Sequence, residues 1–370
     1  MKFIDTFWSG GLKSTKIVVG AFEEAHLEEF IKLSHAEYGQ SVSTDSDHTI
    51  WKHLRSPLGP STYIRLEANG KTVGRIMLQP RQINTSSGQY NVSCITDGLI
   101  DLGFRSPPTN FINLIYAAGK VPDCSFVYHT SNEVTEPLYR NLFRFPQPFS
   151  LCGYGFPLRL AGFFFKFTGV RVNVLDWAIL PLRWLAKLFA FAWLITSKLD
   201  VSERLPDDDM LSSLCSKSLK VSGPIFSRNK SFMKWRLIDA PAWASKVHCF
   251  EKKGTFLGYV AVRKFELEGL SYLAVVDILL DPDTTIFERV AIRSWLILEA
   301  IKSGVDALFT MINPQSRAAR KNIGAPLIRI PNTFLPHITP IYIWSSEGSK
   351  NHDVGKEEST YMTLADLDYL

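Results

Sequence analysis

The hydrophobic and polar positions of this chain form one series of elements that occurs twice. In the first half, apolar residues at helical spacing predict a helix over 26–38, and two runs over 63–68 and 72–78 flank the dipeptide Asn69-Gly70. Two such runs joined by Asn-Gly are a strong signal for a β-hairpin. The next hydrophobic run, 90–97, predicts a central strand.

The rest of the first half continues with helices and strands in alternation. Ser106-Pro107 begin a predicted helix that ends at Gly119, because proline suits the first turn of a helix and glycine its end. A strand over 124–129, a helix that starts at Asn132 and a final strand over 150–154 complete this half.

The second half predicts the same series. Helix, hairpin, strand, helix, strand, helix and strand in this order indicate an α+β fold with a mixed sheet in each half. The predicted elements are a hairpin around Lys253-Gly254, a central strand over 273–280, a helix over 286–303, a strand over 307–312, a helix over 316–323 and a final strand over 341–344.

Single residues repeat together with the pattern. A shift of 180 to 184 positions pairs Trp51/Trp235, Gly70/Gly254, Gly74/Gly258, Asp97/Asp277, Asp101/Asp281, Asn132/Asn313 and Asn141/Asn322. Matches that keep one order and nearly one offset predict two tandem copies of one domain.

Length and composition agree with two domains. A chain of 370 residues with 46% hydrophobic residues exceeds what one hydrophobic core usually organises. The predicted division is an N-terminal domain over 1–160, an amphipathic helical linker over 161–224, a C-terminal domain over 225–345 and a polar tail over 346–370.

Charge and cysteine content exclude some classes of function. The formal net charge is +5 and no run of five basic residues occurs, so we expect no nucleic-acid partner. The five cysteines form no CxxC pair, and the first residues lack an apolar secretory signal. We therefore expect a cytoplasmic protein. No histidine, cysteine or carboxylate cluster has the spacing of metal ligands, so we expect no metal.

The chain resembles the GNAT superfamily of N-acetyltransferases in its tandem form, over about residues 20–160 and 225–345. The resemblance is carried by the order of elements, the Gly70/Gly74 hairpin, the strand that ends in Asp97-Gly-Leu-Ile-Asp101, and the block Asn132 to Tyr139-Arg-Asn-Leu-Phe143. Tandem copies are similar to polysaccharide-linked acyltransferases and Fem-type aminoacyl transferases. The resemblance implies two acyl-CoA N-acyltransferase domains, each a mixed, mostly antiparallel sheet flanked by helices.

The resemblance also implies a binding site for acetyl-CoA or another acyl-CoA. Members of the superfamily hold the pyrophosphate at the N-terminus of the helix after the fourth strand, where backbone N–H groups and the helix dipole stabilise anions. The matching residues are Arg105, Ser106, Thr109 and Asn110. Pro108 and Asn110 stand where glycine is expected, and a proline supplies no N–H donor. In the second half, Asp281-Pro-Asp283 place carboxylates at the equivalent loop, which disfavours phosphate there.

Catalytic residues are expected at the end of the central strand of the first copy. Tyr139 matches the tyrosine that protonates the leaving thiolate in the superfamily, and its counterpart in the second copy is Arg320. Asp97 and Glu133 are the candidate general bases, and His129 could reach the same place. Each also has a structural alternative: a surface helix position for Tyr139, a strand-end or turn role for Asp97 and Asp101, and a hydrogen-bonded strand end for His129.

The linker contains a long amphipathic segment. Arg183 and Lys187 lie on one helical face, and apolar residues, mostly aromatic or leucine, line the other from Trp177 to Ile195. Two basic residues disfavour a membrane-spanning helix. The segment over 174–199 is predicted either to lie on a membrane surface, as a peripheral contact with the inner membrane, or to be buried between the two domains.

The sequence thus predicts an N-acyltransferase that moves an acyl group from acyl-CoA to an amine on a sugar, a lipid-linked molecule or a small molecule. Two alternatives remain open: a catalytically silent binding or scaffold protein, and a Fem-like transferase that uses a donor other than CoA.

Overall fold

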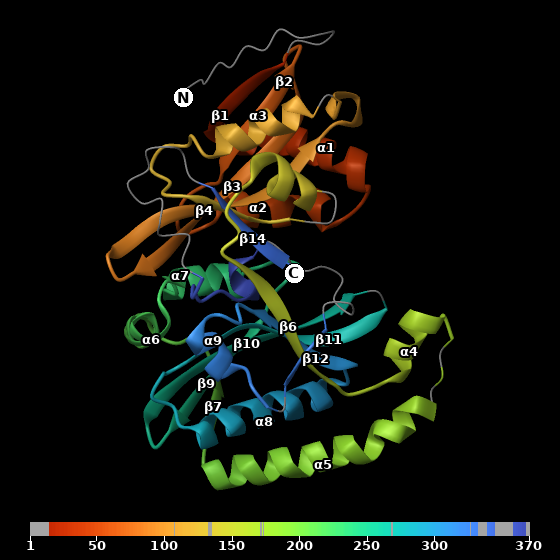
Figure 1. Ribbon diagram of the computed structural model, residues 1–370, viewed down its shortest axis with the longest axis vertical. Coiled ribbons are helices and arrows are strands. Elements are labelled where there is room, and N and C mark those ends of the chain that lie inside the picture. Colours follow the sequence, from red (N-terminus) through yellow and green to blue (C-terminus); the bar gives the residue numbers. More distant parts are fainter. Residues whose placement is uncertain are drawn as a thin grey trace. The chain divides into compact units, whose positions relative to one another are not determined.

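The computed structural model describes residues 15–367 apart from 107, 132–134, 171, 173, 268, 326, 332–338 and 345–357. The chain forms two compact units (Figure 1). Unit 1 comprises Met1–Pro148, Asp239–Ala242 and Pro340–Glu357, and unit 2 comprises Phe149–Ile238, Trp243–Thr339 and Glu358–Leu370. Both units are therefore discontinuous in sequence, whereas the sequence pattern suggested continuous domains.

Unit 1 contains a mixed sheet with strand order β1-β2-β3-β4-β5-β14. All neighbouring strands are antiparallel except β4 and β5, which are parallel. The strands are β1 (Lys16–Ala21), β2 (Thr62–Ala68), β3 (Lys71–Thr85), β4 (Gly88–Ile100), β5 (Val127–Thr130) and β14 (Thr339–Trp344). The helices are α1 (Leu27–Tyr38), α2 (Ser46–Leu54), α3 (Thr109–Ala118) and the π-helix η4 (Leu138–Phe143), with short 3-10 turns η1 (Glu24–His26), η2 (Val42–Thr44) and η3 (Leu102–Phe104).

Unit 2 contains a sheet with the same sequence of pairings. Its strand order is β7-β9-β10-β11-β12-β6, and only β11 and β12 are parallel. The strands are β6 (Phe149–Pro157), β7 (Asp200–Glu203), β8 (Ile225–Phe226), β9 (Lys246–Lys252), β10 (Thr255–Leu267), β11 (Leu270–Leu280), β12 (Ala307–Ile312) and β13 (Ile328–Arg329). The helices are α4 (Ala161–Thr168), α5 (Val174–Ser197), α6 (Asp208–Ser222), α7 (Lys230–Met233), the π-helix η5 (Lys234–Ile238), α8 (Ile286–Ser303), α9 (Arg317–Asn322) and the 3-10 turn η8 (Leu364–Asp366).

The predicted hairpins form, and local sequence explains their turns. Asn69 and Gly70 both have positive φ, 51° and 73°, as do Lys253 and Gly254, 50° and 76°. Two consecutive left-handed residues make the turn whose twist matches paired strands, and Asn-Gly adopts it at little cost. The β2–β3 hairpin and the β9–β10 hairpin are thus equivalent.

The last strand of each half pairs differently from the prediction. The strand predicted over 150–154 as part of the first copy is β6, and it pairs with β12 of unit 2. The strand predicted over 341–344 as part of the second copy is β14, and it pairs with β5 of unit 1. An alternating pattern predicts a strand but not its partner, so the expected assignment of these two strands was wrong.

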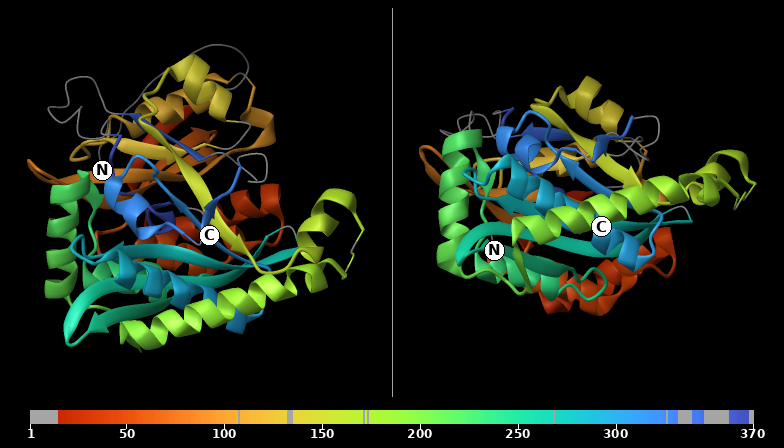
Figure 2. Two further views of the ribbon diagram at one scale, coloured as in Figure 1. Left: turned by 60° about the horizontal axis from the view of Figure 1, so that its bottom comes forward. Right: turned by 90° about the horizontal axis from the view of Figure 1, so that it is seen from below.

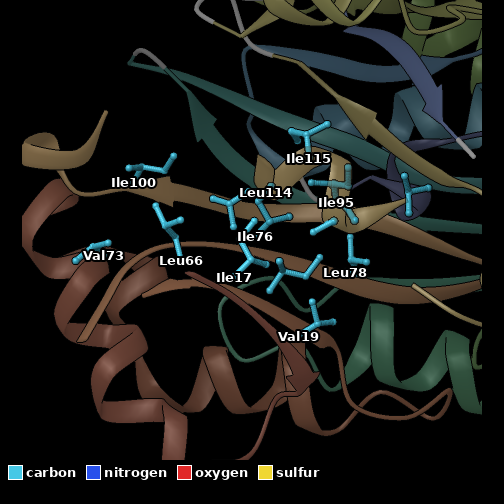
Figure 3. Close-up of a cluster of buried hydrophobic side chains, with 14 of the residues drawn as sticks. Ile17, Val19, Leu66, Val73, Ile76, Leu78, Ile95, Ile100, Leu114 and Ile115 are labelled. Carbon is cyan, nitrogen blue, oxygen red and sulfur yellow. The ribbon is translucent and has the colours of Figure 1, made fainter. Parts of the chain in front are cut away.

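Hydrophobic clusters cover both faces of the unit 1 sheet. Helix α3 packs against β1, β2 and β3, with Leu114 and Ile115 fully buried beside Ile76 (Figure 3). On the other face, Phe30 of α1 packs against Met77. Successive residues of a strand point to opposite faces, which is why Ile76 and Met77 belong to different clusters.

The chain end of unit 2 belongs to its core. Residues 360–367 lie within the predicted polar tail over 346–370, yet every one of them is buried. Ile312 of β12 pairs with Thr363, and η8 packs against β11 and β12. The polar side chains of Thr363 and Asp366 hydrogen-bond to buried Asp277 and Arg228. Polar composition therefore predicted a tail where the structure has part of the core.

Candidate functional site

The parallel strands of unit 1 part before their ends. Pairing of β4 with β5 stops at Cys94 and Tyr128, although β4 continues to Ile100. Beyond this point a β-bulge places Asp97 and Gly98 opposite the single residue Ile76 of β3, and Asp97 takes a positive φ of 47°. A bulge redirects side chains and ends pairing, and such positions are common next to binding sites.

A side chain bridges the parted strands in each unit. In unit 1, His129 Nδ1 of β5 lies 3.3 Å from the carbonyl oxygen of Ile95 in β4. In unit 2, Thr310 Oγ1 of β12 donates to the carbonyl oxygen of Val275 in β11 at 2.9 Å. A carbonyl oxygen only accepts hydrogen bonds, so Nδ1 of His129 carries the proton and Nε2 is the basic nitrogen of the neutral ring.

Asp97 is held by two basic side chains of α2, Lys52 and His53. Its Oδ2 lies 2.7 Å from Lys52 Nζ and 3.0 Å from His53 Nε2, and its backbone carbonyl accepts from Arg75 Nε at 3.3 Å. Burial by itself would raise the pKa of Asp97, but Lys52 and His53 lower that pKa well below its usual range. A carboxylate with so low a pKa is a weak proton acceptor, which favours the structural interpretation of Asp97 over a general-base role.

The same cluster contains a serine, a histidine and an aspartate in hydrogen-bond sequence. His53 Nδ1 lies 3.0 Å from Ser61 Oγ, and His53 Nε2 lies 3.0 Å from Asp97. A nucleophile and its base have this connectivity. Ser61 and His53 are both 0% exposed, however, so no substrate can reach the hydroxyl, and the arrangement is part of the core.

Asp277, the counterpart of Asp97, anchors a fully buried network in unit 2. Its Oδ2 accepts from Arg228 Nε at 2.8 Å and from the Tyr259 hydroxyl at 2.7 Å, and its Oδ1 accepts from Thr363 at 2.8 Å. Arg228 also donates to Asp366 Oδ2 at 2.7 Å. Burial lowers the pKa of Arg228, but the two carboxylates outweigh it and raise that pKa well above its usual value.

Asp101 and Asp281 are turn residues. Asp101 Oδ1 accepts from the N–H of Gly103 at 2.8 Å, and Asp281 Oδ1 accepts from the N–H of Asp283 at 2.9 Å. Their own N–H groups donate to the carbonyls of Val73 and Leu257, each at 2.8 Å. A side chain that accepts from the backbone N–H two residues ahead stabilises a turn. This is the turn role that the sequence analysis gave as the alternative for Asp101.

The helix N-terminus that follows β4 is open to an anion. Helix α3 begins after Pro108, and its first turn has no capping side chain and no acidic residue. Thr109 and Asn110 are the first two residues of α3, and the Asn110 amide donates to the carbonyl of Phe104 at 2.8 Å, which closes the loop. The first N–H groups of a helix have no partner within it, so this end favours a phosphate.

The guanidinium of Arg105 is already paired in this arrangement. Its Nη2 lies 2.6 Å from Glu37 of α1, and its Nε donates to the carbonyl of Ile100 at 2.8 Å. The Arg105 side chain is 41% exposed, so a phosphate could compete for it only against Glu37. Ser106 is exposed on the same loop.

The equivalent helix N-terminus of unit 2 is closed. Thr285 and Glu288 cap α8 reciprocally, with Glu288 Oε2 2.9 Å from the N–H of Thr285, and Glu288 Oε1 pairs with Lys252 at 2.8 Å. Arg289 donates to the carbonyls of Asp281, Pro282 and Thr284, which fixes the preceding loop. The carboxylate at this capped helix end is Glu288, which disfavours phosphate there.

The parting of β11 and β12 is also filled by unit 2 itself. Pairing between these strands ends at Ala274 and Phe309. Beyond it, Thr363 binds Asp277 and pairs with Ile312, and the Tyr361 hydroxyl donates to the carbonyl of Ile278. A thioester could enter there only if this segment left its place.

The remaining candidate residues are placed as follows. Tyr139 is 2% exposed and its ring stacks on Tyr342 at 5.5 Å and lies 4.8 Å from the His129 ring, so it is a core residue beside the strand parting. Glu133 and Asn132 lie outside the described residues. Within the described part of the chain, no three histidine, cysteine or acidic side chains are grouped as metal ligands would be.

The structure brings together His129, Tyr139 and the bulge at Asp97. It also reveals the basic residues that pair with Asp97 and Asp277, which sequence reasoning missed. Lys52, His53 and Arg228 gave no signal beyond lying near the repeated Trp51 and Trp235. The recurrence of Asp97 as Asp277 was the one available hint that a buried partner exists in both halves.

No protein-family model matches the chain, and no curated protein is similar to it in sequence. Solved structures of N-acyltransferases are similar to it in fold. A GCN5-related N-acetyltransferase from Anabaena variabilis has a TM-score of 0.58 at 9% identity, over 89% of this chain and 72% of its own. A conserved protein from Enterococcus faecalis V583, named a probable N-acyltransferase, has 0.54 at 12%, over 91% and 74%. Saccharomyces cerevisiae N-myristoyltransferase with bound myristoyl-CoA has 0.52 at 12%, over 89% and 82%.

These similarities show the fold. The chain has a GNAT-like N-acyltransferase fold, an α+β arrangement of mixed sheets with flanking helices, and the fold class predicted from the sequence is confirmed.

The Arg228 network predicts a large difference between buried and exposed ion pairs. Arg228→Met leaves Asp277 and Asp366 buried without their cation, which should reduce the free energy of unfolding by about 3–5 kcal/mol. Lys217→Met, which removes an exposed pair with Asp281, should cost about 0–1 kcal/mol. Urea denaturation of both variants measures this, and equal losses would contradict it.

Asp97 predicts a pH-dependent loss of stability. Because its pKa is lower in the folded chain than the unfolded value of about 3.9, its contribution is present above that value and disappears as the pH falls further. Asp97→Asn should therefore be less stable than the wild type at neutral pH, and the difference should shrink below about pH 4. Thermal melts across this range test it, and a difference that is constant with pH would exclude the ionised role.

Proposed function

We propose that this protein is an acyl-CoA-dependent N-acyltransferase whose donor binds to unit 1. The observation that supports this best is the contrast between two equivalent helix ends: α3 follows the bulged strand β4 with an uncapped first turn, whereas α8 is capped by Thr285 and Glu288. The N-acyltransferase structures with the same fold add support, including one with bound myristoyl-CoA.

The residues of unit 1 fit a pyrophosphate in part. Backbone N–H groups at Thr109 and Asn110 and the positive end of the α3 dipole would hold it. Proline at position 108 removes one donor, and Arg105 would have to exchange Glu37 for phosphate. The donor would supply a thioester whose carbonyl carbon an amine attacks, so that a C–N bond forms and the C–S bond breaks.

His129 is the best-placed general base among the candidates in the described part of unit 1. It lies where β4 and β5 part, and because its Nδ1 donates to the Ile95 carbonyl, Nε2 is the ring nitrogen that we propose takes the amine proton. Asp97 is already bound by Lys52 and His53. Tyr139, whose ring adjoins His129, is the acid that the resemblance implies, but its side chain is 2% exposed, so we do not assign it that role.

The acceptor is proposed to be an amine on a sugar, a lipid-linked molecule or a small molecule. Thr310 takes the place of His129 in unit 2 and cannot act as a base at neutral pH, and residues 360–367 occupy the parting of its strands. Unit 2 is therefore proposed not to hold a second donor.

A specific observation favours the alternative of a silent binding protein. The Arg105–Glu37 pair and Pro108 weaken the phosphate site, so the fold could persist without the donor. Calorimetric titration with acetyl-CoA and palmitoyl-CoA separates the two: micromolar binding supports the transferase, and absence of heat with both supports the alternative.

A carboxylate at the start of α3 should repel the donor. Thr109→Asp is expected to raise the Kd for acyl-CoA by about tenfold or more through like-charge repulsion, while an acidic residue in the first turn keeps the helix stable. Ile286→Asp, at the first position of α8, is the matched control and should leave the Kd unchanged. Glu37→Gln should lower the Kd if Arg105 joins the site, because it frees the guanidinium.

His129→Gln separates catalysis from binding. The glutamine amide can still donate to the Ile95 carbonyl, so the strands stay bridged, but it cannot take a proton. We expect turnover, measured as release of free thiol with an amine found by screening, to fall by about 10²–10⁴ at an unchanged Kd for acyl-CoA. Thr310→Val in unit 2 is the control and should affect stability only. Full activity of His129→Gln would exclude it as the base.

A further inference from the structure

Helix α5 of unit 2 exposes a continuous hydrophobic face. The helix has 24 residues, and its large apolar side chains are mostly more than half exposed. The exposed residues are Val174 (66%), Trp177 (74%), Leu180 (39%), Trp184 (55%), Leu185 (63%), Leu188 (61%), Phe189 (53%), Phe191 (58%) and Ile195 (60%). A soluble surface rarely shows so many neighbouring apolar groups without a partner.

The opposite face of α5 packs along α8. Ile179 and Ala190 are buried, and the Trp193 ring stacks on Phe287 of α8 at 5.7 Å. At about 100° per residue, Leu188 points almost opposite to Ile179 and Ala190, and Trp184 points about 120–140° away from them. Figures 1 and 2 show α8 on one side of α5 and no other described element of unit 2 over its outward side.

This packing decides between spanning a membrane and lying on it. By length and composition α5 could cross a membrane. However, α5 packs lengthwise along α8, which covers β11 and β12, so a span would place this open sheet at membrane depth, where its edges could not be satisfied. Ile286 and Phe287 in the first turn of α8 are exposed as well, beside the end of α5 that carries Trp193.

The surrounding charge favours an anionic surface. Between residues 158 and 199 the chain has six basic residues and one acidic residue, so this segment has a net charge of +5 (6 − 1), equal to that of the whole chain. The acidic residue, Asp176, is engaged by the N–H groups of Leu160 and Ala161 at 2.8 Å each. Arg183 and Lys187 border the apolar face, and Lys187 Nζ lies 5.3 Å above the Trp184 ring.

We propose that α5 lies in the surface of an anionic lipid bilayer, with Trp184 and Leu188 in the acyl region and Arg183 and Lys187 at the phosphates. Tryptophan, phenylalanine and leucine on one side with basic residues beside them are what such an interface stabilises. This proposal does not depend on acyl-CoA binding. A second copy of the chain, the competing occupant, would offer the same basic border and so repel this one.

Sedimentation with vesicles tests the proposal on the full chain. We expect the protein to pellet with vesicles of phosphatidylcholine and phosphatidylglycerol, and much less with phosphatidylcholine alone. Trp184→Glu/Leu188→Glu should weaken binding by about tenfold or more, since it places charges in the acyl region. Arg183→Gln/Lys187→Gln should weaken binding to the mixed vesicles only.

Ile328→Glu is the matched control, because Ile328 is an apolar side chain of unit 2 that is 61% exposed and lies outside α5. It should bind vesicles like the wild type. The proposal is overturned if the wild type does not pellet with mixed vesicles or if Ile328→Glu loses binding equally. A second copy of the chain is the occupant instead if the wild type binds no vesicles and light scattering shows that it is a dimer. In that case the Trp184→Glu/Leu188→Glu variant should be a monomer.

Discussion

A buried carboxylate near the end of each central strand must be matched by a cation from another segment, and much of the structure depends on that requirement. In unit 1, Asp97 is matched by Lys52 and His53 from α2. In unit 2, Asp277 is matched by Arg228, which comes shortly before α7. An unpaired buried charge costs several kcal/mol, so each pair fixes a peripheral segment against its sheet.

The cation in unit 2 has a second effect. Arg228 also binds Asp366, and Asp366 accepts from the N–H of Thr363 at 2.9 Å, so residues 360–367 are held at the parting of β11 and β12. In unit 1, His129 bridges the equivalent strands to the carbonyl of Ile95. The same requirement therefore holds the chain end at the strand parting in unit 2, whereas in unit 1 it holds α2.

Sequence predicted the features that depend on local chemistry. Asn69-Gly70 defines a turn through its left-handed backbone conformations, and Ser316 begins α9 by accepting a hydrogen bond from the N–H of Ala319. Partners distant in sequence were not predictable. The pairing of β14 with β5, 211 residues apart from Thr130 to Ile341, and the pairing of Glu37 with Arg105 are decided by tertiary packing.

The candidate site follows the same division. The loop before α3 was predicted because helix start signals are local, but its strength as a phosphate site depends on Glu37, which no pattern placed nearby. Asp97 was recognised from its recurrence at Asp277, yet its low pKa comes from Lys52 and His53, whose role needs the folded α2.

The two units keep their backbone contacts while their side chains differ, and this separates scaffold from chemistry. The N–H groups of Asp101 and Asp281 donate to equivalent carbonyls, and both parallel pairs part at the same place in the sheet order. The residue that bridges the parted strands is free to vary as long as it donates one hydrogen bond, which both His129 and Thr310 do. Only the imidazole offers a second nitrogen that takes a proton near neutral pH. One exchange of side chain at an equivalent backbone position is thus enough to give one unit a titratable ring that the other unit lacks.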